Sequence, residues 1–367
     1  MKSKIIIAGG GTGGHIFPAI AIANALQREE AGVELLFVGA KGKMEMEKVP
    51  QAGFRIKGID IAGFNRSSML KNMGLPFKLL KSYFQVRSIV ADFMPDAVVG
   101  VGGYSSFPVL RFAQAHGIPT FIHESNSFAG KSNRMLGKRA QSIFVASYGM
   151  EKFFPAAKLK LTGNPVRKNI SDSRITREEG IASFGLNPAM KTVLVTGGSL
   201  GARGINEAID ASISIFEQNN LQLIWQTGKP YGERARQASE GKVNVWTGEF
   251  ITSMEYAYAA ADMVVSRSGA MAIAELCVVA KPAILIPFPF AAEDHQTVNA
   301  EYLVSNNAGI LIKDSEAKNR LGDAIINLAK DDAMQAQLVK HISALAVGNA
   351  DEVIAKQILA DLKEKQK

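Results

Sequence analysis

The stretch KIIIAGGGTGGHIFPAI, residues 4–20, decides the fold that we predict for this chain of 367 residues. Its first part is apolar and β-branched without alternation, which is typical of a buried parallel strand. The part after the glycines has the composition of a helix start, so Gly9–Gly14 occupy a strand-to-helix turn. Backbone amides in such a turn can face an anion, the helix dipole adds to the attraction, and the missing Cβ atoms let a ligand approach. His15 adds a titratable group at the mouth of this turn.

The same device occurs twice more along the chain. The apolar run 97–101 leads into Gly102-Gly103-Tyr104-Ser105-Ser106, and the run 192–196 leads into Gly197-Gly198-Ser199-Leu200-Gly201. One glycine pair after a strand is a weak signal, but three of them predict an α/β protein with two Rossmann-like domains. We expect parallel sheets that face a central cleft, with ligands at the carboxyl ends of the strands. Strands are expected at 4–8, 35–38, 97–101, 119–122, 142–146, 192–196, 221–226, 243–246, 263–265 and 283–286.

A Gly-Asn-Pro turn at residues 163–165 is suited to a hinge between the two domains. We therefore expect an N-terminal domain over residues 1–163 and a C-terminal domain over residues 164–349. The tail, residues 350–367, is expected to form a charged amphipathic helix.

The composition limits the class of protein and its partners. Hydrophobic residues make up 47% and charged residues 21%, as in ordinary globular proteins. The single cysteine, Cys277, excludes an internal disulfide, and we expect it to be a buried small residue. No apolar run approaches the roughly 20 residues that span a bilayer, and the first one is too short for a signal peptide. These features favour a cytoplasmic or peripheral protein.

The net charge of +8 is concentrated in the first half of the chain. Residues 61–91 contain five basic residues, no acidic residue and many large apolar ones, including the run Lys78-Leu79-Leu80-Lys81. This composition is typical of a surface that lies on anionic lipid, although a core with a solvated basic face is the alternative. The anionic partners that a basic first half could bind are a membrane, a substrate and nucleic acid. The chain shows no nucleic-acid motif, so nucleic acid ranks last among them.

The second half contains a further candidate for anion binding. A strand at 262–265 is followed by Ser266-Arg267-Ser268-Gly269 and by a helix, for which we expect Ser268 to be the N-cap. Such a helix start can bind a diphosphate, and Glu275 can accept hydrogen bonds from a ribose diol. Gln296 stands in a second polar helix start. Ordinary solvated helix polarity is the alternative for both residues.

Taken together, these segments resemble the MurG family, the UDP-N-acetylglucosamine transferases of peptidoglycan assembly. That family adds GlcNAc to undecaprenyl-diphospho-MurNAc-pentapeptide. The resemblance implies the GT-B fold, a UDP-GlcNAc donor in the C-terminal domain, a lipid-linked acceptor in the N-terminal domain and a C-terminal helix that crosses back onto the first domain. The matching segments, in the family's order across essentially the whole chain, are 10–18, 102–106, 123–126, 163–167, 197–203, 266–269 and 294–296.

The resemblance also implies a set of substrate-binding residues. Ile251 would lie against the uracil, and the helix start would hold the diphosphate and the ribose. Two positions depart from the family pattern, because Ser125 stands where Gln is more usual and Ala272 where Thr is common. The residues implied are Thr12, Gly13, Gly14, Asn126, Arg167, Ser199, Ile251, Ala270, Met271, Ala272, Ile273, Ala274, Glu275 and Gln296.

An inverting transferase needs a base for the acceptor hydroxyl and positive potential for the departing diphosphate. His15 is the first candidate for the base, since the ordinary pKa of imidazole is near 6.5. The alternative is that His15 only orients a phosphate or the acceptor, and Glu124 is the second candidate for the base. The chain contains no Asp-x-Asp, so we expect no metal and no cofactor. The turn 197–201, the helix start 268–271 and Arg167 would supply the positive potential.

Three other classes of protein remain as alternatives. A UDP-GlcNAc 2-epimerase-like isomerase shares this kind of fold but needs no lipid surface. A dinucleotide-dependent oxidoreductase needs an acidic residue at the end of the second strand, where this chain has Gly39-Ala40-Lys41. A nucleotide-binding module without catalysis is disfavoured by His15 and Glu275.

Overall fold

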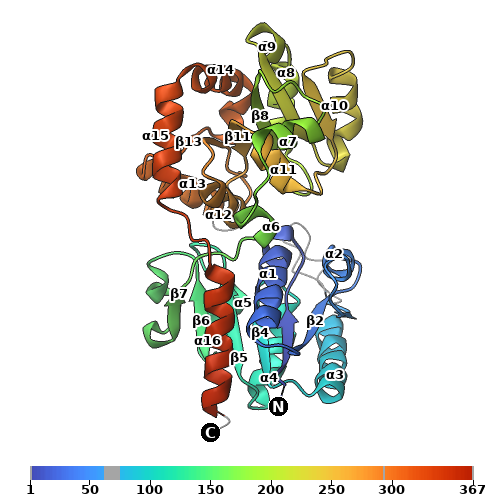
Figure 1. Cartoon of the computed structure of the whole chain (residues 1–367). Coiled ribbons are helices and arrows are strands. Elements are labelled where there is room, and N and C mark those ends of the chain that lie inside the picture. Colours follow the sequence, from blue (N-terminus) through green and yellow to red (C-terminus); the bar gives the residue numbers. More distant parts are fainter. Residues whose placement is uncertain (1, 62–74, 292–293, 366–367) are drawn as a thin grey trace. The chain divides into compact units, whose positions relative to one another are not determined.

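The computed structural model describes residues 2–61, 75–291 and 294–365, and the chain forms two compact units (Figure 1). The first unit, here the N-terminal domain, comprises Met1–Arg167 and Asn349–Lys367, and the second, the C-terminal domain, comprises Lys168–Gly348. The sequence places this boundary between residues 163 and 164, four residues earlier. Among the helices described, none combines the length and the apolar character needed to cross a membrane.

The N-terminal domain is built on a seven-stranded sheet in the order β3-β2-β1-β4-β5-β6-β7, and each neighbouring pair is parallel. Ile5 and Ile7 face one apolar core, while Ile6 and Ala8 face another. Both faces of the sheet are covered, which explains why the first strand is apolar without alternation. The strands are β1 (Lys4–Ala8), β2 (Glu34–Ala40), β3 (Ile56–Ile59), β4 (Ala97–Gly100), β5 (Thr120–Glu124), β6 (Ser142–Val145) and β7 (Leu159–Leu161).

The helices of the N-terminal domain follow the strands and cover the sheet (Figure 1). They are α1 (Gly13–Glu29), α2 (Glu45–Gln51), α3 (Leu75–Phe93), α4 (Ser106–Ala115), α5 (Lys131–Gly137) and α16 (Ala350–Lys365).

Helix α16 comes from the far end of the chain and packs beside α1 (Figure 1). Ile354, Ile358 and Leu362 are buried in the same core as Ile5 and Ile16. The helix is further held by an ion pair of 2.6 Å from Arg28 to Asp351, whose side chain is 2% exposed. The expected return of the C-terminal helix to the first domain is confirmed.

The C-terminal domain repeats this architecture with six parallel strands in the order β10-β9-β8-β11-β12-β13. Its core surrounds Trp225, which is fully buried and donates a hydrogen bond of 3.0 Å to Oδ1 of Asn206. The strands are β8 (Lys191–Thr196), β9 (Leu221–Gln226), β10 (Val245–Gly248), β11 (Met263–Ser266), β12 (Ala283–Leu285) and β13 (Ile310–Leu311). The helices are α6 (Lys168–Ser171), α7 (Arg177–Ser183), α8 (Arg203–Ala211), α9 (Ser214–Gln218), α10 (Gly232–Ala238), α11 (Met254–Ala260), α12 (Ala270–Val279), α13 (His295–Ser305), α14 (Ala317–Lys330) and α15 (Asp332–Ser343).

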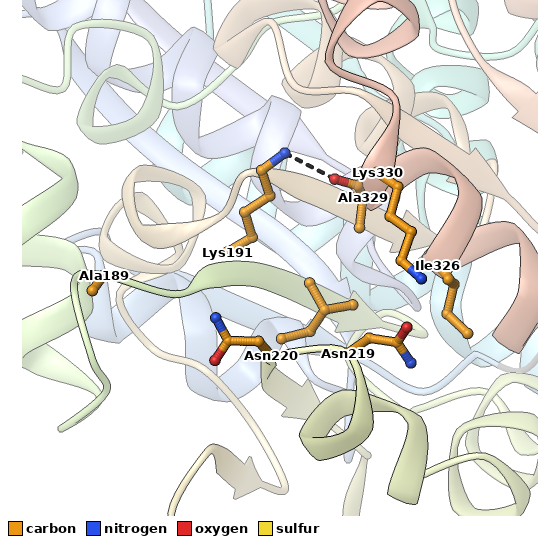
Figure 2. Close-up of a pocket in the computed structure, with 8 residues that line it drawn as sticks. Ala189, Lys191, Asn219, Asn220, Ile326, Ala329 and Lys330 are labelled. Atoms are coloured by element: carbon orange, nitrogen blue, oxygen red, sulfur yellow. Dashed lines mark hydrogen bonds between the residues drawn. The ribbon is translucent and has the colours of Figure 1, made fainter.

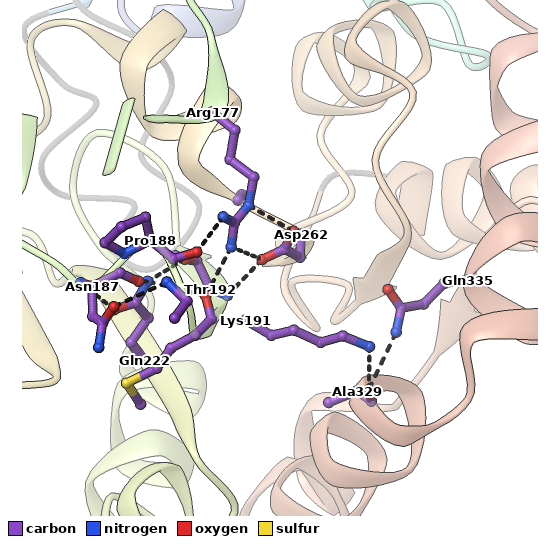
Figure 3. Close-up of polar contacts among 12 residues, drawn as sticks. Arg177, Asn187, Pro188, Lys191, Thr192, Gln222, Asp262, Ala329 and Gln335 are labelled. Carbon is purple, nitrogen blue, oxygen red and sulfur yellow. Dashed lines mark hydrogen bonds and ion pairs between the residues drawn. The ribbon is translucent and has the colours of Figure 1, made fainter. Parts of the chain in front are cut away.

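A polar network ties α7 to the amino end of this sheet (Figure 3). The Arg177 guanidinium donates to both carboxylate oxygens of Asp262, at 3.1 and 2.9 Å, and to the carbonyls of Pro188 and Met190. Asp262 in turn accepts from the amide of Thr192 at 2.7 Å. The network fixes the ends of β8 and β11 that lie opposite the expected binding edge.

A cavity of about 240 Å³ lies at the same amino end of the sheet (Figure 2). The ammonium group of Lys191 donates to the carbonyl of Ala329 at its rim. Ligands of parallel sheets bind at the opposite, carboxyl ends of the strands, so this cavity is not part of the candidate site. It is lined by Ala189, Lys191, Asn219, Asn220, Leu221, Ile326, Ala329 and Lys330.

Candidate active site

The first glycine turn connects β1 to α1 and carries His15. Thr12 is the N-cap residue of α1, and its carbonyl accepts the amide of His15 at 3.1 Å. The Thr12 hydroxyl lies 3.2 Å from Nδ1 of the His15 ring. Gly11 has φ +90°, a conformation that favours glycine. His15 is therefore held on the first turn of the helix, half-buried, by the residue three positions before it.

A buried carboxylate lies against this turn. Glu45, the first residue of α2, is 1% exposed, and its Oε2 accepts the amide of Gly11 at 2.8 Å. Its Oε1 accepts the amide of Ala40 at the end of β2, at 2.9 Å. The Gly11 amide of this turn therefore faces an anionic group of the protein itself, the Glu45 carboxylate.

The second glycine turn, after β4, packs directly on the first. A Cβ atom built on Gly103 would lie 2.3 Å from the carbonyl oxygen of Gly10. One built on Gly102 would lie 2.7 Å from Cδ2 of His15. Only glycine allows this approach, so the pair Gly102-Gly103 serves to seat the first turn and the imidazole.

Glu124 ends β5 and is 4% exposed. Its two oxygens accept four hydrogen bonds: from the amide and the side chain of Asn126 at 3.2 and 3.3 Å, from the Gly130 amide at 3.1 Å and from the Asn133 side chain at 2.9 Å. Glu124 thus orients the loop that carries Asn126, and this arrangement disfavours it as the base.

His123 precedes Glu124 and is fully buried. Burial lowers the pKa of His123 to about 4, a backbone hydrogen bond to Gly163 opposes the shift, and nearby His15 adds to it. The ring is therefore neutral near pH 7. Ser125, one of the two departures from the family pattern, places its hydroxyl 3.4 Å from Nδ1 of this ring.

Arg167, the last residue before the C-terminal domain, reaches the start of α1. Its guanidinium lies 4.4 Å from the centre of the Phe17 ring, in a cation–π contact. Phe17 follows His15 by two residues. A permanent positive charge and the imidazole thus share one helix start.

In the C-terminal domain, the third glycine turn is held by a neutral amide. Gln226, at the end of β9, donates to the Thr196 hydroxyl at 3.1 Å and to the Gly198 carbonyl at 3.0 Å. Its Oε1 accepts the amide of Ile251 at 2.9 Å. Ser199 lies half-buried in this turn, and Ile251 is 4% exposed. The backbone amide of Ile251, the residue expected beside the uracil, is thus engaged with Gln226.

Three segments of the chain meet at the start of α12: residues 268–269, Phe288 and Gln296. Gly269 is its N-cap, and the expectation that Ser268 takes this role is wrong, because the Ser268 hydroxyl donates instead to the carbonyl of Gln296 at 2.7 Å. The side-chain Oε1 of Gln296 accepts the amide of Phe288 at 3.0 Å. Nε2 of Gln296 lies 4.0 Å from a Cβ position built on Gly269. Gln296 therefore lies beside the helix start that was expected to bind an anion.

Glu275 lies further along α12 and is 8% exposed. It accepts a hydrogen bond of 3.0 Å from the hydroxyl of Tyr258 on α11, a partner that sequence reasoning missed. Cys277 on the same helix is buried, and burial raises the pKa of its thiol to about 12, as suits a structural role. Within the described residues, no three His, Cys, Asp or Glu side chains gather as they would around a metal ion.

Comparison with known proteins supplies the family. Residues 5–145 match the N-terminal domain of glycosyltransferase family 28, and residues 192–358 match its C-terminal domain. The chain belongs to this family. A UDP-N-acetylglucosamine–N-acetylmuramyl-(pentapeptide) pyrophosphoryl-undecaprenol N-acetylglucosamine transferase from Phocaeicola vulgatus is 49% identical over 99% of this chain and 98% of its own.

Solved structures agree on the GT-B fold. A MurG from Acinetobacter baumannii is 27% identical, with a TM-score of 0.74 over 98% of this chain and 99% of its own. A UDP-GlcNAc 2-epimerase from Neisseria meningitidis also matches, with a TM-score of 0.68 over 98% of this chain and all of its own, at 14% identity. At that identity the second likeness shows the fold alone, so the epimerase alternative has the weaker support.

In this family 28 glycosyltransferase, the residues predicted to bind substrate form one group in each domain. In the N-terminal domain, the first helix start brings Thr12, Gly13, Gly14 and His15 together with Arg167. In the C-terminal domain, Ser199, Ile251, Ala270–Glu275 and Gln296 follow the carboxyl ends of neighbouring parallel strands or the helices after them. Each group therefore lies at the edge of its sheet where α/β proteins bind ligands.

Proposed function

We propose that the chain transfers GlcNAc from UDP-GlcNAc to the C4 hydroxyl of MurNAc in undecaprenyl-diphospho-MurNAc-pentapeptide, with inversion at the anomeric carbon. The observation that carries this proposal is the 49% identity to a transferase of that name across nearly the whole of both chains. The reaction contributes to peptidoglycan synthesis, and through it to cell shape and division.

The C-terminal domain binds the donor in this proposal. Glu275 takes the ribose hydroxyls, the amides at the start of α12 take the diphosphate, and Gln296 takes the sugar. Three contacts support this assignment: Tyr258 orients Glu275, Phe288 orients Gln296, and Gln226 fixes the glycine turn. Ile251 lies beside the uracil, and Ser199, Asn126 and Arg167 complete the donor contacts that the family pattern implies.

His15 is the base that removes the proton of the acceptor hydroxyl. Its half-buried ring at a helix start leaves it accessible, whereas the oxygens of Glu124 are occupied by four donors. A general base of this kind contributes about 10²–10⁴-fold to the rate.

The leaving UDP is stabilised by protein dipoles. The helix dipole and the backbone amides at the start of α12 favour negative charge, and each contact contributes about 0.3–1 kcal/mol when exposed and up to ~2 kcal/mol when partly buried. Because charge grows on the diphosphate as the bond to GlcNAc breaks, these contacts stabilise the transition state more than the ground state.

The lipid-linked acceptor implies peripheral docking at the cytoplasmic face of the membrane, through residues 61–91. Residues 62–74, including Arg66 and Lys71, lie outside the described residues, as do the side chains of residues 75–79. In the described part of α3, Leu80 and Phe84 are 58% and 57% exposed and share one helix face. Lys81 lies 3.0 Å from Asp60, so its charge is partly balanced within the protein.

The decisive experiment measures labelled GlcNAc transfer from UDP-GlcNAc to a short-chain lipid I analogue. Transfer with release of UDP supports the proposal. Formation of ManNAc without the acceptor would indicate the epimerase instead.

Docking is tested with anionic and neutral vesicles at two salt concentrations. Binding to the anionic vesicles should weaken with salt, and it should weaken further in Leu80→Ser/Phe84→Ser. Val243→Ser is the matched control, because Val243 is 94% exposed in the C-terminal domain. Equal binding to both kinds of vesicle, or none, would contradict the docking.

A further inference from the structure

Glu45 is a buried carboxylate for which the proposed reaction has no step. It is 1% exposed, and its two oxygens accept backbone amides from two different segments, Gly11 at 2.8 Å and Ala40 at 2.9 Å. A carboxylate has acceptors only, so it satisfies two converging donors without conflict. Glutamine offers one acceptor oxygen and would turn its NH₂ group toward the other amide.

The backbone around Glu45 leaves room for this side chain. A Cβ on Gly10 would lie 2.3 Å from Cδ of Glu45, and one on Gly39 would lie 2.5 Å from its Cγ. Two glycines, one after β1 and one in β2, thus open the slot that the carboxylate fills. The fit shows that Glu45 is an integral part of the turn and not a solvated residue of α2.

The first glycine turn is clamped from two sides. Glu45 holds the Gly11 amide, and Gly103 packs against the carbonyl of Gly10. Thr12 follows Gly11 directly and contacts His15 twice, through its carbonyl at 3.1 Å and its hydroxyl at 3.2 Å. A continuous series of short contacts therefore leads from the carboxylate to the imidazole.

We propose that Glu45 is a positioning residue for His15: its carboxylate fixes the first glycine turn so that the imidazole meets the acceptor hydroxyl. This inference rests on the proposed function. We expect Glu45 to act on the rate of transfer rather than on donor binding, because Glu275 and Gln296, which are assigned to the ribose and the donor sugar, belong to the C-terminal domain.

The test compares Glu45→Gln with Glu47→Gln in the full chain. Glu47 lies two residues further along α2 and its side chain is 66% exposed, so it is a matched control that should behave as wild type. For Glu45→Gln we expect kcat to fall about 10–100-fold, the size of effect that a misplacement of about 1 Å produces, with KM for UDP-GlcNAc within about twofold.

Two readouts do not depend on turnover. Amide hydrogen exchange at Gly11 or Ala40 should accelerate in Glu45→Gln, and the imidazole proton resonances of His15 should shift, with neither change in Glu47→Gln. If wild type transfers no GlcNAc, the proposed function fails while these two readouts still test the positioning.

Several outcomes would overturn the inference. They are an unchanged kcat, His15 resonances like those of wild type, or a parallel loss of kcat and donor affinity together with a lower melting temperature. If Glu45→Gln does not fold, Glu45→Asp provides the same measurements. Asp keeps the charge but is too short to reach both amides, and we expect kcat to fall about tenfold with donor KM unchanged.

Discussion

The first and third glycine turns occupy equivalent places in the two domains, yet they are held by side chains of different charge. Each follows the third strand in its sheet order, β1 or β8. Each is held by a residue at or after the end of the adjacent strand, Glu45 after β2 and Gln226 on β9. The first turn therefore carries a negative charge against its backbone, and the third does not.

This difference indicates how the same kind of glycine turn can serve two different substrates. Two unit charges about 6 Å apart interact by roughly 3 kcal/mol at an effective dielectric constant of 20, so a carboxylate beside a turn opposes binding of a diphosphate. In the proposed reaction the first turn meets a neutral hydroxyl and a histidine base, while the third meets UDP. The charge of the side chain behind each turn thus matches the reacting group that the proposal places there, a neutral hydroxyl at the first turn and UDP at the third.

The largest effect is expected from His15→Ala, which removes the chemistry from the first turn. It should lower kcat by about 10²–10⁴-fold and leave UDP affinity nearly unchanged. Steady-state kinetics with a lipid I analogue, together with UDP binding by calorimetry, check both parts. A variant with near-normal kcat would return the role of base to Glu124 or to bound water.

The next effect concerns the donor side of the comparison. Glu275→Ala removes a charge-assisted hydrogen bond, which is worth roughly 1.5–3 kcal/mol, so kcat/KM for UDP-GlcNAc should fall by about one to two powers of ten. KM should rise in the same variant. Glu301→Ala, at an exposed position on α13, is the control and should match wild type. Unchanged donor kinetics in Glu275→Ala would remove this residue from the site.

Adding a negative charge behind the third turn tests directly whether the charge there affects donor binding. Gln226→Glu should raise KM for UDP-GlcNAc roughly tenfold, because the new carboxylate opposes the diphosphate. Gln226→Met removes all three hydrogen bonds of the Gln226 side chain without adding charge and should have the smaller effect on KM. Equal effects in the two variants would show that hydrogen bonding and not charge matters here.

The smallest effect is expected from removing metal ions. The chain lacks Asp-x-Asp, and the proposed stabilisation of UDP uses helix dipoles and Arg167. Activity should therefore persist in excess EDTA. A complete loss that Mg²⁺ or Mn²⁺ restores would show that the dipoles do not suffice.

Much of the fold could be predicted from the sequence, because long apolar strands and glycine turns leave strong local signals. The strands β3, β7 and β13 were missed. They lie at the sheet edges and contain only four, three and two residues, with Lys57 and Lys160 among them. Such short segments owe their pairing to the neighbouring strand and not to their own composition.

The candidate site was less predictable, because its supporting contacts join segments that are distant in sequence. Glu45 stands in the charged run KGKMEMEK, which looks like a solvated surface. The side chain becomes buried only through glycines at positions 10 and 39. The sequence predicts Ser268 as the N-cap of a helix, but its hydroxyl donates to the carbonyl of Gln296, 28 residues away.

The return of α16 to the first domain has a consequence for how the protein is made. Synthesis completes β1 and α1 before the C-terminal domain, but the side chains that cover them, among them Ile354 and Ile358, follow that domain in the chain. Until then the apolar surface beside Ile16 stays uncovered, while all of residues 168–348 can already fold. The N-terminal domain is therefore completed only after residues 168–348 have been synthesised, and a nascent chain that stops before α16 exposes the apolar surface of α1.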